Sequence, residues 1–216
     1  MGLKVYGAAM STCTARVLTA LIEKEAEYEL VPVNLAVGEH KQPAYLAKHP
    51  FGQIPVLEDD DLTLFESRAI AAYVSYKYKT QGTDLLRIGN LKEAGLVGVW
   101  IEVESQQFNP AISALVYQLV IAPAFGRPVD QAIIDTNTEK LGKVLDVYEA
   151  RLSSNKYLAG DFFSLADLNH LPYTYYLMKT GSASLINERP HVKAWWEDIS
   201  SRPAFVKVSE NMNLGG

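Results

Sequence analysis

Short apolar runs and helix-spaced apolar positions alternate through the first eighty residues of the chain. The runs at residues 3–6 and 28–33 predict strands, and a helix between them is predicted to begin in the polar stretch 11–14. The two strands are parallel if that helix is a right-handed crossover. The chain is therefore expected to open with a strand–helix–strand unit.

Two further apolar runs, at residues 54–58 and 62–65, are separated by three aspartates. A turn-forming connection this short favours a hairpin, whose strands are antiparallel. From residue 67 the pattern changes to helical spacing, which ends in the polar stretch 79–84. Together these elements predict an α/β domain with a mixed sheet.

Nearly all of the chain after that polar stretch is predicted to be helical. Ser164 and Asp167 have the S-x-x-D spacing of a capping box, and a further helix over residues 191–199 is closed before Pro203. The clearest helix carries a core-facing stripe at Leu141, Val144, Leu145, Tyr148 and Leu152.

Two domains follow from this change of pattern. We expect the α/β domain at residues 1–80, a linker at 81–90 and an all-helical domain at 91–216. The chain has 216 residues, of which 48% are hydrophobic and 21% are charged, so it can bury cores of this size.

Charge and composition exclude several partners. The formal net charge is -5 without a cluster of lysine or arginine, so no field would gather nucleic acid or an anionic membrane. The apolar stretch 119–125 contains Pro123 and is far shorter than the roughly 20 residues that a membrane span requires. Cys13 is the only cysteine, which excludes an intrachain disulfide and favours a soluble, cytoplasmic protein.

Ser11 follows the first predicted strand and precedes the first predicted helix. The unpaired amides and the positive dipole end of a helix favour a negative charge there. A free thiol is only ~3% ionised at neutral pH, whereas helix N-termini lower thiol pKa values to ~3.5–7.5. A hydroxyl at this place could therefore stabilise a bound thiolate. The alternative is that Ser11, Thr12 or Thr14 simply caps the helix.

A second motif, Gln53-Ile54-Pro55, lies at the entrance of a predicted strand. A cis peptide bond before the proline would turn the preceding backbone N–H and C=O away from the sheet and leave them free for a peptide-like ligand. An ordinary tight turn is the alternative.

In a third motif, Phe65-Glu66-Ser67-Arg68, a strand ends and a helix begins. Ser67 would cap the helix and bind a carboxylate, while Glu66 would pair with an ammonium group. A carboxylate and an ammonium on one carbon define an amino acid. The alternative is a capping serine beside an exposed glutamate.

The order of these motifs resembles the glutathione transferases, whose first domain is thioredoxin-like. The likeness extends over nearly the whole chain and is closest to the plant phi class. It rests on residues 4–7, 11–12, 38–41, 50–55 and 64–70 in the first half, and on 157–161, 164–168 and 190–196 in the second.

The resemblance implies that glutathione is the co-substrate and that Ser11 is the catalytic residue, which stabilises the thiolate without being a nucleophile. Thr12 would assist at the same helix end, and Arg16 would add positive potential. The other contacts implied are His40 and Lys41 to the glycyl carboxylate, Gln53 and the Ile54 backbone to the cysteinyl segment before cis-Pro55, and Glu66 with Ser67 to the γ-glutamyl end.

The second substrate is expected to be a small hydrophobic electrophile that binds in an apolar cleft between the domains. By resemblance, the cleft is lined by Met10, Leu35, Tyr117, Val120 and Phe125. Each of these residues could equally be ordinary core. Several phi-class sequences carry phenylalanine in place of Leu35, which leaves the acceptor preference open.

Other expectations follow from the resemblance: a homodimer, a role in detoxification and stress response, and glutathione peroxidase activity towards organic hydroperoxides in the same site. A ligandin-type carrier of hydrophobic metabolites is an alternative. So is a thiol transferase or dehydroascorbate reductase that uses Cys13, although this thiol also fits inert packing or reversible capping by glutathione. The four histidines show no metal spacing, and no metal is expected.

Overall fold

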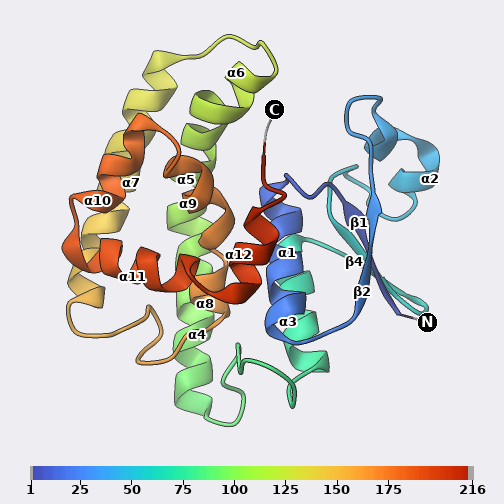
Figure 1. Cartoon of the computed structure of the whole chain (residues 1–216), viewed down its shortest axis with the longest axis horizontal. Coiled ribbons are helices and arrows are strands. Elements are labelled where there is room, and N and C mark those ends of the chain that lie inside the picture. The colour runs from blue at the N-terminus through green and yellow to red at the C-terminus, as the bar shows by residue number, and fades with distance from the viewer. Residues whose placement is uncertain (1, 214–216) are drawn as a thin grey trace. The chain divides into compact units, whose positions relative to one another are not determined.

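The computed structural model of the chain describes residues 2–213. These residues divide into two compact units, the first made of residues 2–85 together with 207–213 and the second of residues 86–206. Figure 1 traces the chain through both. The division falls after Leu85, and no sequence signal indicated that residues 207–213 group with the first unit.

A four-stranded sheet in the order β2-β1-β3-β4 forms the centre of the first unit. β1 pairs with β2 in parallel and with β3 antiparallel, and β3 and β4 form an antiparallel hairpin. The mixed sheet is thus confirmed. Its strands are β1 (Leu3–Gly7), β2 (Tyr28–Pro32), β3 (Val56–Asp59) and β4 (Leu62–Phe65).

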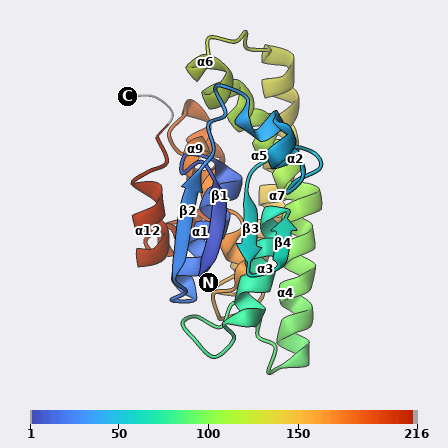
Figure 2. The same ribbon diagram turned by 90° about the vertical axis from the view of Figure 1, so that its right-hand side faces the viewer.

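Two helices, α1 (Thr12–Glu23) and α3 (Ser67–Lys77), pack against each other on one face of this sheet. The short helices η1 (Glu39–Lys41) and α2 (Pro43–Leu46) belong to the connection from β2 to β3, and α2 lies on the other side of the sheet (Figures 1 and 2). The buried core between the sheet and α1 includes Val5, Val17, Leu21 and Leu57.

The polar stretch 79–84 is fixed against the end of α1. The Thr83 N–H donates to the Glu23 carbonyl at 2.9 Å, and the Lys24 ammonium donates to the Thr83 carbonyl at 2.7 Å. Gly82 has φ +54, and a Cβ there would lie 2.1 Å from the Glu23 oxygen. A residue without a side chain is therefore required at this close approach.

The second unit is all-helical, as expected. A continuous helical run begins at α4 and contains two π-helical segments, which the apolar spacing did not indicate. That run comprises α4 (Leu91–Val103), η2 (Glu104–Phe108), α5 (Asn109–Val116), η3 (Tyr117–Ile121) and α6 (Ala122–Ala124). The remaining helices are α7 (Gln131–Leu152), α8 (Leu165–Leu168), α9 (Leu171–Leu177), η4 (Gly181–Ala183), α10 (Ser184–Asn187) and α11 (Pro190–Ser200). The last helix, α12 (Pro203–Ser209), crosses the division between the two units after residue 206.

Asp167 organises the polar centre of the second unit. Its carboxylate accepts hydrogen bonds from the Ser164 N–H and hydroxyl, which completes the predicted capping box of α8. The same carboxylate accepts from the Leu158 N–H and from the Trp195 indole, each at 3.0 Å. Burial raises the pKa of Asp167, and these donors act against that rise. One side chain thus joins α8, α11 and the loop before α8.

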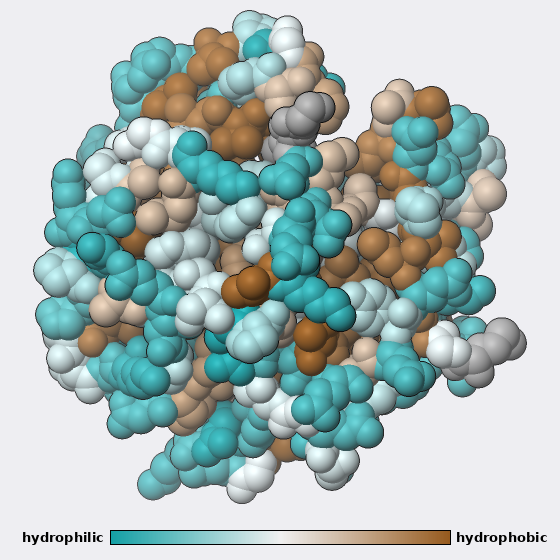
Figure 3. Space-filling view, in the orientation of Figure 1, coloured by the Kyte–Doolittle hydropathy of each residue, from teal (hydrophilic) through white to brown (hydrophobic). Residues whose placement is uncertain are grey.

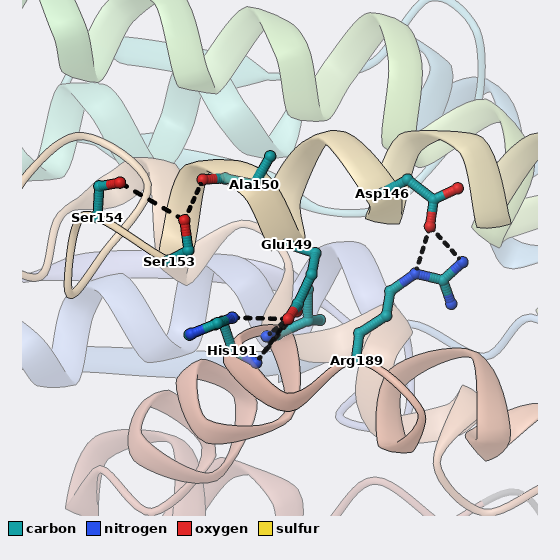
Figure 4. A network of polar contacts seen from close by, with 8 residues as sticks. Asp146, Glu149, Ala150, Ser153, Ser154, Arg189 and His191 are labelled. Atoms are coloured by element: carbon teal, nitrogen blue, oxygen red, sulfur yellow. Dashed lines mark hydrogen bonds and ion pairs between the residues drawn. The ribbon is translucent and has the colours of Figure 1, made fainter.

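Side-chain and backbone donors at the start of α11 bind two carboxylates of α7 (Figure 4). Asp146 accepts from the Arg189 guanidinium at 2.7 and 2.9 Å. Glu149 accepts from the backbone N–H groups of His191 and Val192, the latter at 2.9 Å, so it caps α11 from a neighbouring helix.

Among residues 2–213, no helix is both long enough and apolar enough to cross a membrane.

Candidate functional site

Ser11 occupies the N-cap of α1, with extended backbone angles of φ -72 and ψ 129. Its hydroxyl oxygen accepts the Thr14 N–H at 3.4 Å. Accepting one hydrogen bond leaves the O–H of a serine available as a donor. The first turn of α1 carries no acidic side chain that would compete with a bound anion. Capping the helix and binding an anion are therefore compatible roles for this residue.

Ile54 and Pro55 are joined by a cis peptide bond, as the resemblance implies. Within residues 2–213, the backbone N–H and C=O of Ile54 make no hydrogen bond to the protein. The preceding carbonyl, that of Gln53, accepts from the Tyr45 hydroxyl at 2.9 Å. Burial raises the pKa of Tyr45 to about 12, so its hydroxyl remains a donor at neutral pH. The backbone of Gln53 is thus held in place by Tyr45, while the backbone N–H and C=O of Ile54 remain available to a ligand.

His40 and Lys41 lie beside the loop that leads to Gln53. The Lys41 ammonium donates to the Phe51 carbonyl at 3.0 Å, and the His40 Nδ1 is buried without a hydrogen-bond partner in the described chain. The backbone of Gly52, at φ +56, lies close to that of His40. A Cβ at position 52 would lie 2.7 Å from the His40 carbonyl oxygen, so glycine allows the two segments to approach this closely.

Glu66 and Ser67 form a corner between β4 and α3. Glu66 is exposed and takes the left-handed φ of 68, which a residue with a side chain adopts at a cost. It occupies the N-cap of α3, so the prediction that Ser67 caps this helix is wrong. The Ser67 hydroxyl is instead buried and accepts from the Arg16 guanidinium at 2.7 Å. Its own O–H remains a donor for a ligand.

The sequence did not predict the hydrogen bond from Arg16 to Ser67. Arg16 is fully buried in α1, 51 positions before Ser67. The available signal was an arginine between Ala15 and Val17, in the middle of an otherwise apolar helix. Long charged side chains are rarely fully buried unless they have a partner. Its partner could not be read from the pattern, because it lies on a different element.

The sheet register brings the three motifs to one edge. Val56 pairs with Tyr6 on one side and with Phe65 on the other. The end of β1, which leads to Ser11, the start of β3 after Pro55, and the end of β4 before Glu66 are therefore adjacent. Segments far apart in the sequence thus present a hydroxyl at a helix N-terminus, free backbone groups and a carboxylate at the same end of the sheet.

The residues predicted to line the second-substrate cleft belong to different units. Leu35 packs against a buried cluster of the first unit that includes Val33, Tyr45 and Val56, and Met10, partly buried, precedes Ser11 in the same unit. In the second unit lie Tyr117, Val120 and Phe125.

Tyr117 and Phe125 are 38% and 56% exposed, so they are surface rather than core residues of the second unit. Val120, between them in η3, is partly buried. The Arg127 guanidinium donates to the Tyr117 hydroxyl at 3.1 Å and lies 5.9 Å from the Phe125 ring centre. In Figure 3 the surface around α6 is a mixture of hydrophobic and hydrophilic residues.

Cys13 lies in the first turn of α1, two positions after Ser11, and is partly buried. Its thiol forms no disulfide. Across residues 2–213, no three His, Cys, Asp or Glu side chains are grouped in a way that could hold a metal ion.

Both units match models of one family. The description "Glutathione S-transferase, N-terminal domain" matches residues 1–76, and "Glutathione S-transferase, C-terminal domain" matches residues 108–203. A mixed thioredoxin-like sheet followed by a helical unit is the fold of this class. The chain therefore belongs to the glutathione S-transferase family and is a transferase.

Within the family, the chain is similar to the plant phi class. It is 58% identical to glutathione S-transferase F13 of Arabidopsis thaliana over 214 residues, which cover 99% of this chain and 98% of that relative. The crystal structure of glutathione transferase F7 from Populus trichocarpa is 70% identical, with a TM-score of 0.96 over 98% of this chain and 99% of that one. Glutathione S-transferase I from maize, in complex with an atrazine glutathione conjugate, is 51% identical, with a TM-score of 0.91 over 98% of each chain.

Proposed function

We propose that this protein conjugates the thiolate of glutathione to small hydrophobic electrophiles, and that the Ser11 hydroxyl stabilises the thiolate. The observation that carries the proposal is the position of Ser11 at the N-cap of α1, with its oxygen accepting the Thr14 N–H and its O–H left to donate. A sulfur placed there would meet a hydrogen-bond donor and the positive end of a helix together.

The magnitude required of this site is modest. Lowering a thiol pKa by about two units needs roughly 2.7 kcal/mol of preference for the thiolate. A hydrogen bond to a charged group contributes ~1.5–3 kcal/mol, and a helix N-terminus adds ~0.3–1 kcal/mol. With Thr12 at the same helix end, Ser11 and α1 can supply that preference. The proton leaves to solvent, and the resulting thiolate attacks the electrophilic carbon.

We assign the tripeptide to the edge of the sheet where the three motifs meet. His40 and Lys41 bind its glycyl carboxylate, and the free Ile54 backbone groups bind the cysteinyl segment beside Gln53 and Pro55. Glu66 pairs with the γ-glutamyl ammonium. Ser67, oriented by Arg16, donates to the carboxylate on the same carbon.

The electrophile binds, in this proposal, against Met10, Leu35, Tyr117, Val120 and Phe125. A new S–C bond forms, and in a substitution the bond from carbon to its leaving group breaks as that group departs with the electron pair. The maize relative, which holds an atrazine glutathione conjugate, supports a small organic acceptor. Organic hydroperoxides are a second acceptor class, reduced to alcohols while two glutathione molecules are oxidised to the disulfide.

The assignment extends to domains and location. Residues 1–80 would bind glutathione, 81–90 would link, and 91–216 would contribute the electrophile site. The single cysteine supports a reducing compartment, and with it a cytoplasmic role in detoxification and stress response.

We also propose a homodimer, because apolar side chains are exposed on α4, among them Leu91, Leu96 and Val99 at 88%, 42% and 56%.

The test is Ser11→Ala, with Ser11→Thr as the control that keeps a hydroxyl. The pKa of the bound thiol, followed by thiolate absorbance, should return towards ~8.5 in the alanine variant, and kcat/KM at neutral pH should fall about a hundredfold. The threonine variant should stay much closer to the wild type. Full conjugation activity in Ser11→Ala would refute the proposal.

Two outcomes would favour other functions. Tight binding of hydrophobic ligands without turnover of any electrophile or hydroperoxide would favour a carrier. Dehydroascorbate reduction that is lost in Cys13→Ser would favour thiol chemistry at Cys13.

A further inference from the structure

His49 is a buried titratable residue to which the proposed mechanism gives no role. Only 2% of it is exposed. Its backbone N–H donates to the Tyr45 carbonyl at 3.0 Å, and its carbonyl accepts the Gly52 N–H at 2.8 Å. His49 therefore begins the loop that carries Gln53 and Ile54.

The imidazole ring connects this loop to the corner at Glu66 and Ser67. Its centre is 4.7 Å from that of the Phe65 ring, at an interplanar angle of 31°. It also meets the Phe51 ring edge-on, at 6.2 Å. Phe65 immediately precedes Glu66 and Phe51 lies two positions before Gln53, so the imidazole ring contacts one aromatic side chain on each of the two segments.

The protonation state of this ring is coupled to its surroundings. Its Nδ1 is buried and has no hydrogen-bond partner among the described residues. Burial lowers the pKa of His49; the Glu66 carboxylate acts in the opposite direction, and the Lys41 ammonium reinforces the effect of burial. The ring is consequently neutral at pH 7.

We propose that His49 is a positioning residue for glutathione: its neutral ring holds the Gln53 loop against the Phe65–Ser67 corner, and its protonation weakens the binding of the γ-glutamyl end. The inference rests on the proposed function and adds a pH-sensitive element to the same site.

The coupling passes through Glu66. The Glu66 carboxylate attracts a positive charge on His49, so a protonated His49 competes with the ammonium group of the ligand for this carboxylate. By thermodynamic reciprocity, bound ligand must make His49 harder to protonate by the same factor.

The experiment uses S-methylglutathione, which has no thiol to ionise, and measures its dissociation constant calorimetrically for the full chain between about pH 7.5 and about pH 5.5. Wild type is compared with His49→Gln, which keeps a polar side chain but cannot titrate. The ratio of the two dissociation constants cancels the contributions of all other titratable groups, because both proteins contain them. We expect the ratio of wild type to His49→Gln to rise about twofold or more across this range.

A second variant separates the effect of ring packing on affinity from the effect of protonation. His49→Ala removes the ring contacts with Phe65, so it should weaken binding at every pH. His49→Gln should bind within about threefold of wild type at pH 7.5. A ratio that does not change with pH, together with wild-type affinity in His49→Ala, would overturn the inference. Absence of binding by the wild type at every pH would instead refute the proposed function.

The wild type alone gives an independent readout if His49→Gln does not fold. Proton NMR titration of the four histidine rings, with and without S-methylglutathione, should show one ring whose pKa falls when the ligand binds. A titration in which no ring shifts downwards would contradict the coupling.

Discussion

At the residue scale, the lack of a side chain at Gly52 decides how closely the loop before Gln53 approaches His40. Gly52 lies between His49 and Gln53, and its φ of +56 is costly for any residue with a Cβ. Added atoms would meet the His40 carbonyl, which is backbone and cannot swing away. The geometry of the proposed glycyl carboxylate site therefore depends on a missing side chain.

Gly52→Ala should lower the free energy of unfolding by about 1–3 kcal/mol, because the left-handed backbone and the 2.7 Å contact both oppose a Cβ. It should also weaken the binding of S-methylglutathione, since the loop must move away from His40. Urea unfolding and calorimetry measure the two effects. Gly89→Ala is the matched control, because no atom lies within 4 Å of a Cβ at that position. Equal stability of the two variants would contradict this account.

At the element scale, the second unit depends on one helix capping another. The N-terminus of α11 has no side-chain cap of its own, and Glu149 of α7 supplies the acceptor (Figure 4). Burial alone would raise the pKa of Glu149, but hydrogen bonds from the N–H groups of Val192 and His191 and from the His191 ring outweigh it, and the pKa is lowered. The charged form of Glu149 thus stabilises the contact between the two helices.

Glu149→Ala should therefore reduce the free energy of unfolding by about 1–3 kcal/mol at neutral pH. A carboxyl whose folded pKa is lowered stabilises the protein above its unfolded pKa of about 4.3, and this contribution is lost as pH falls through the folded value. The gap between wild type and variant, measured by denaturant unfolding, should consequently narrow below about pH 4.3.

Glu139→Ala is the control on the same helix. Glu139 forms an exposed pair with Lys143, and such pairs contribute little to stability. Its removal should leave unfolding unchanged. If Glu139→Ala lowered the free energy of unfolding as much as Glu149→Ala, capping of α11 by Glu149 would not explain the loss of stability.

At the scale of the whole molecule, the apolar face of α4 is the surface that a second copy would cover. Leu96 and Val99 lie about one turn apart on this helix. Gly95 precedes Leu96 and Gly98 precedes Val99, and a Cβ added at either glycine would have no atom within 4 Å. A neighbouring backbone could approach such a face closely.

Leu96→Glu should convert the proposed dimer into a 23.9 kDa monomer, because a carboxylate would be buried at the interface without a partner. Sedimentation velocity measures the change. Val147→Glu introduces the same charge at an exposed apolar position of α7 and should leave the oligomeric state as in the wild type. A wild type that sediments as a monomer at micromolar concentration would end the dimer proposal.

Local signals predicted the four strands and several of the helices. A cap at Ser11, Thr12 or Thr14 was one interpretation of the stretch between the first strand and the first helix, because a hydroxyl there supplies the missing acceptor for helix amides. The structure places the cap at Ser11. The capping box at Ser164 and Asp167 was foreseen for the same reason. Ser67 was assigned as a cap wrongly, since the left-handed conformation of Glu66 moves the cap one residue earlier, and that conformation depends on how β4 and α3 meet.

What the sequence determined by itself was the four strands, the mixed sheet, the helical character of the second unit and the three motifs with their family, because apolar periodicity and capping residues act over a few positions along the chain. Only the tertiary structure decided that Arg16 donates to Ser67, that His49 packs against Phe65 and that Glu149 caps α11. These contacts join residues on different elements, and burial in a packed interior, rather than local propensity, selects which side chains meet.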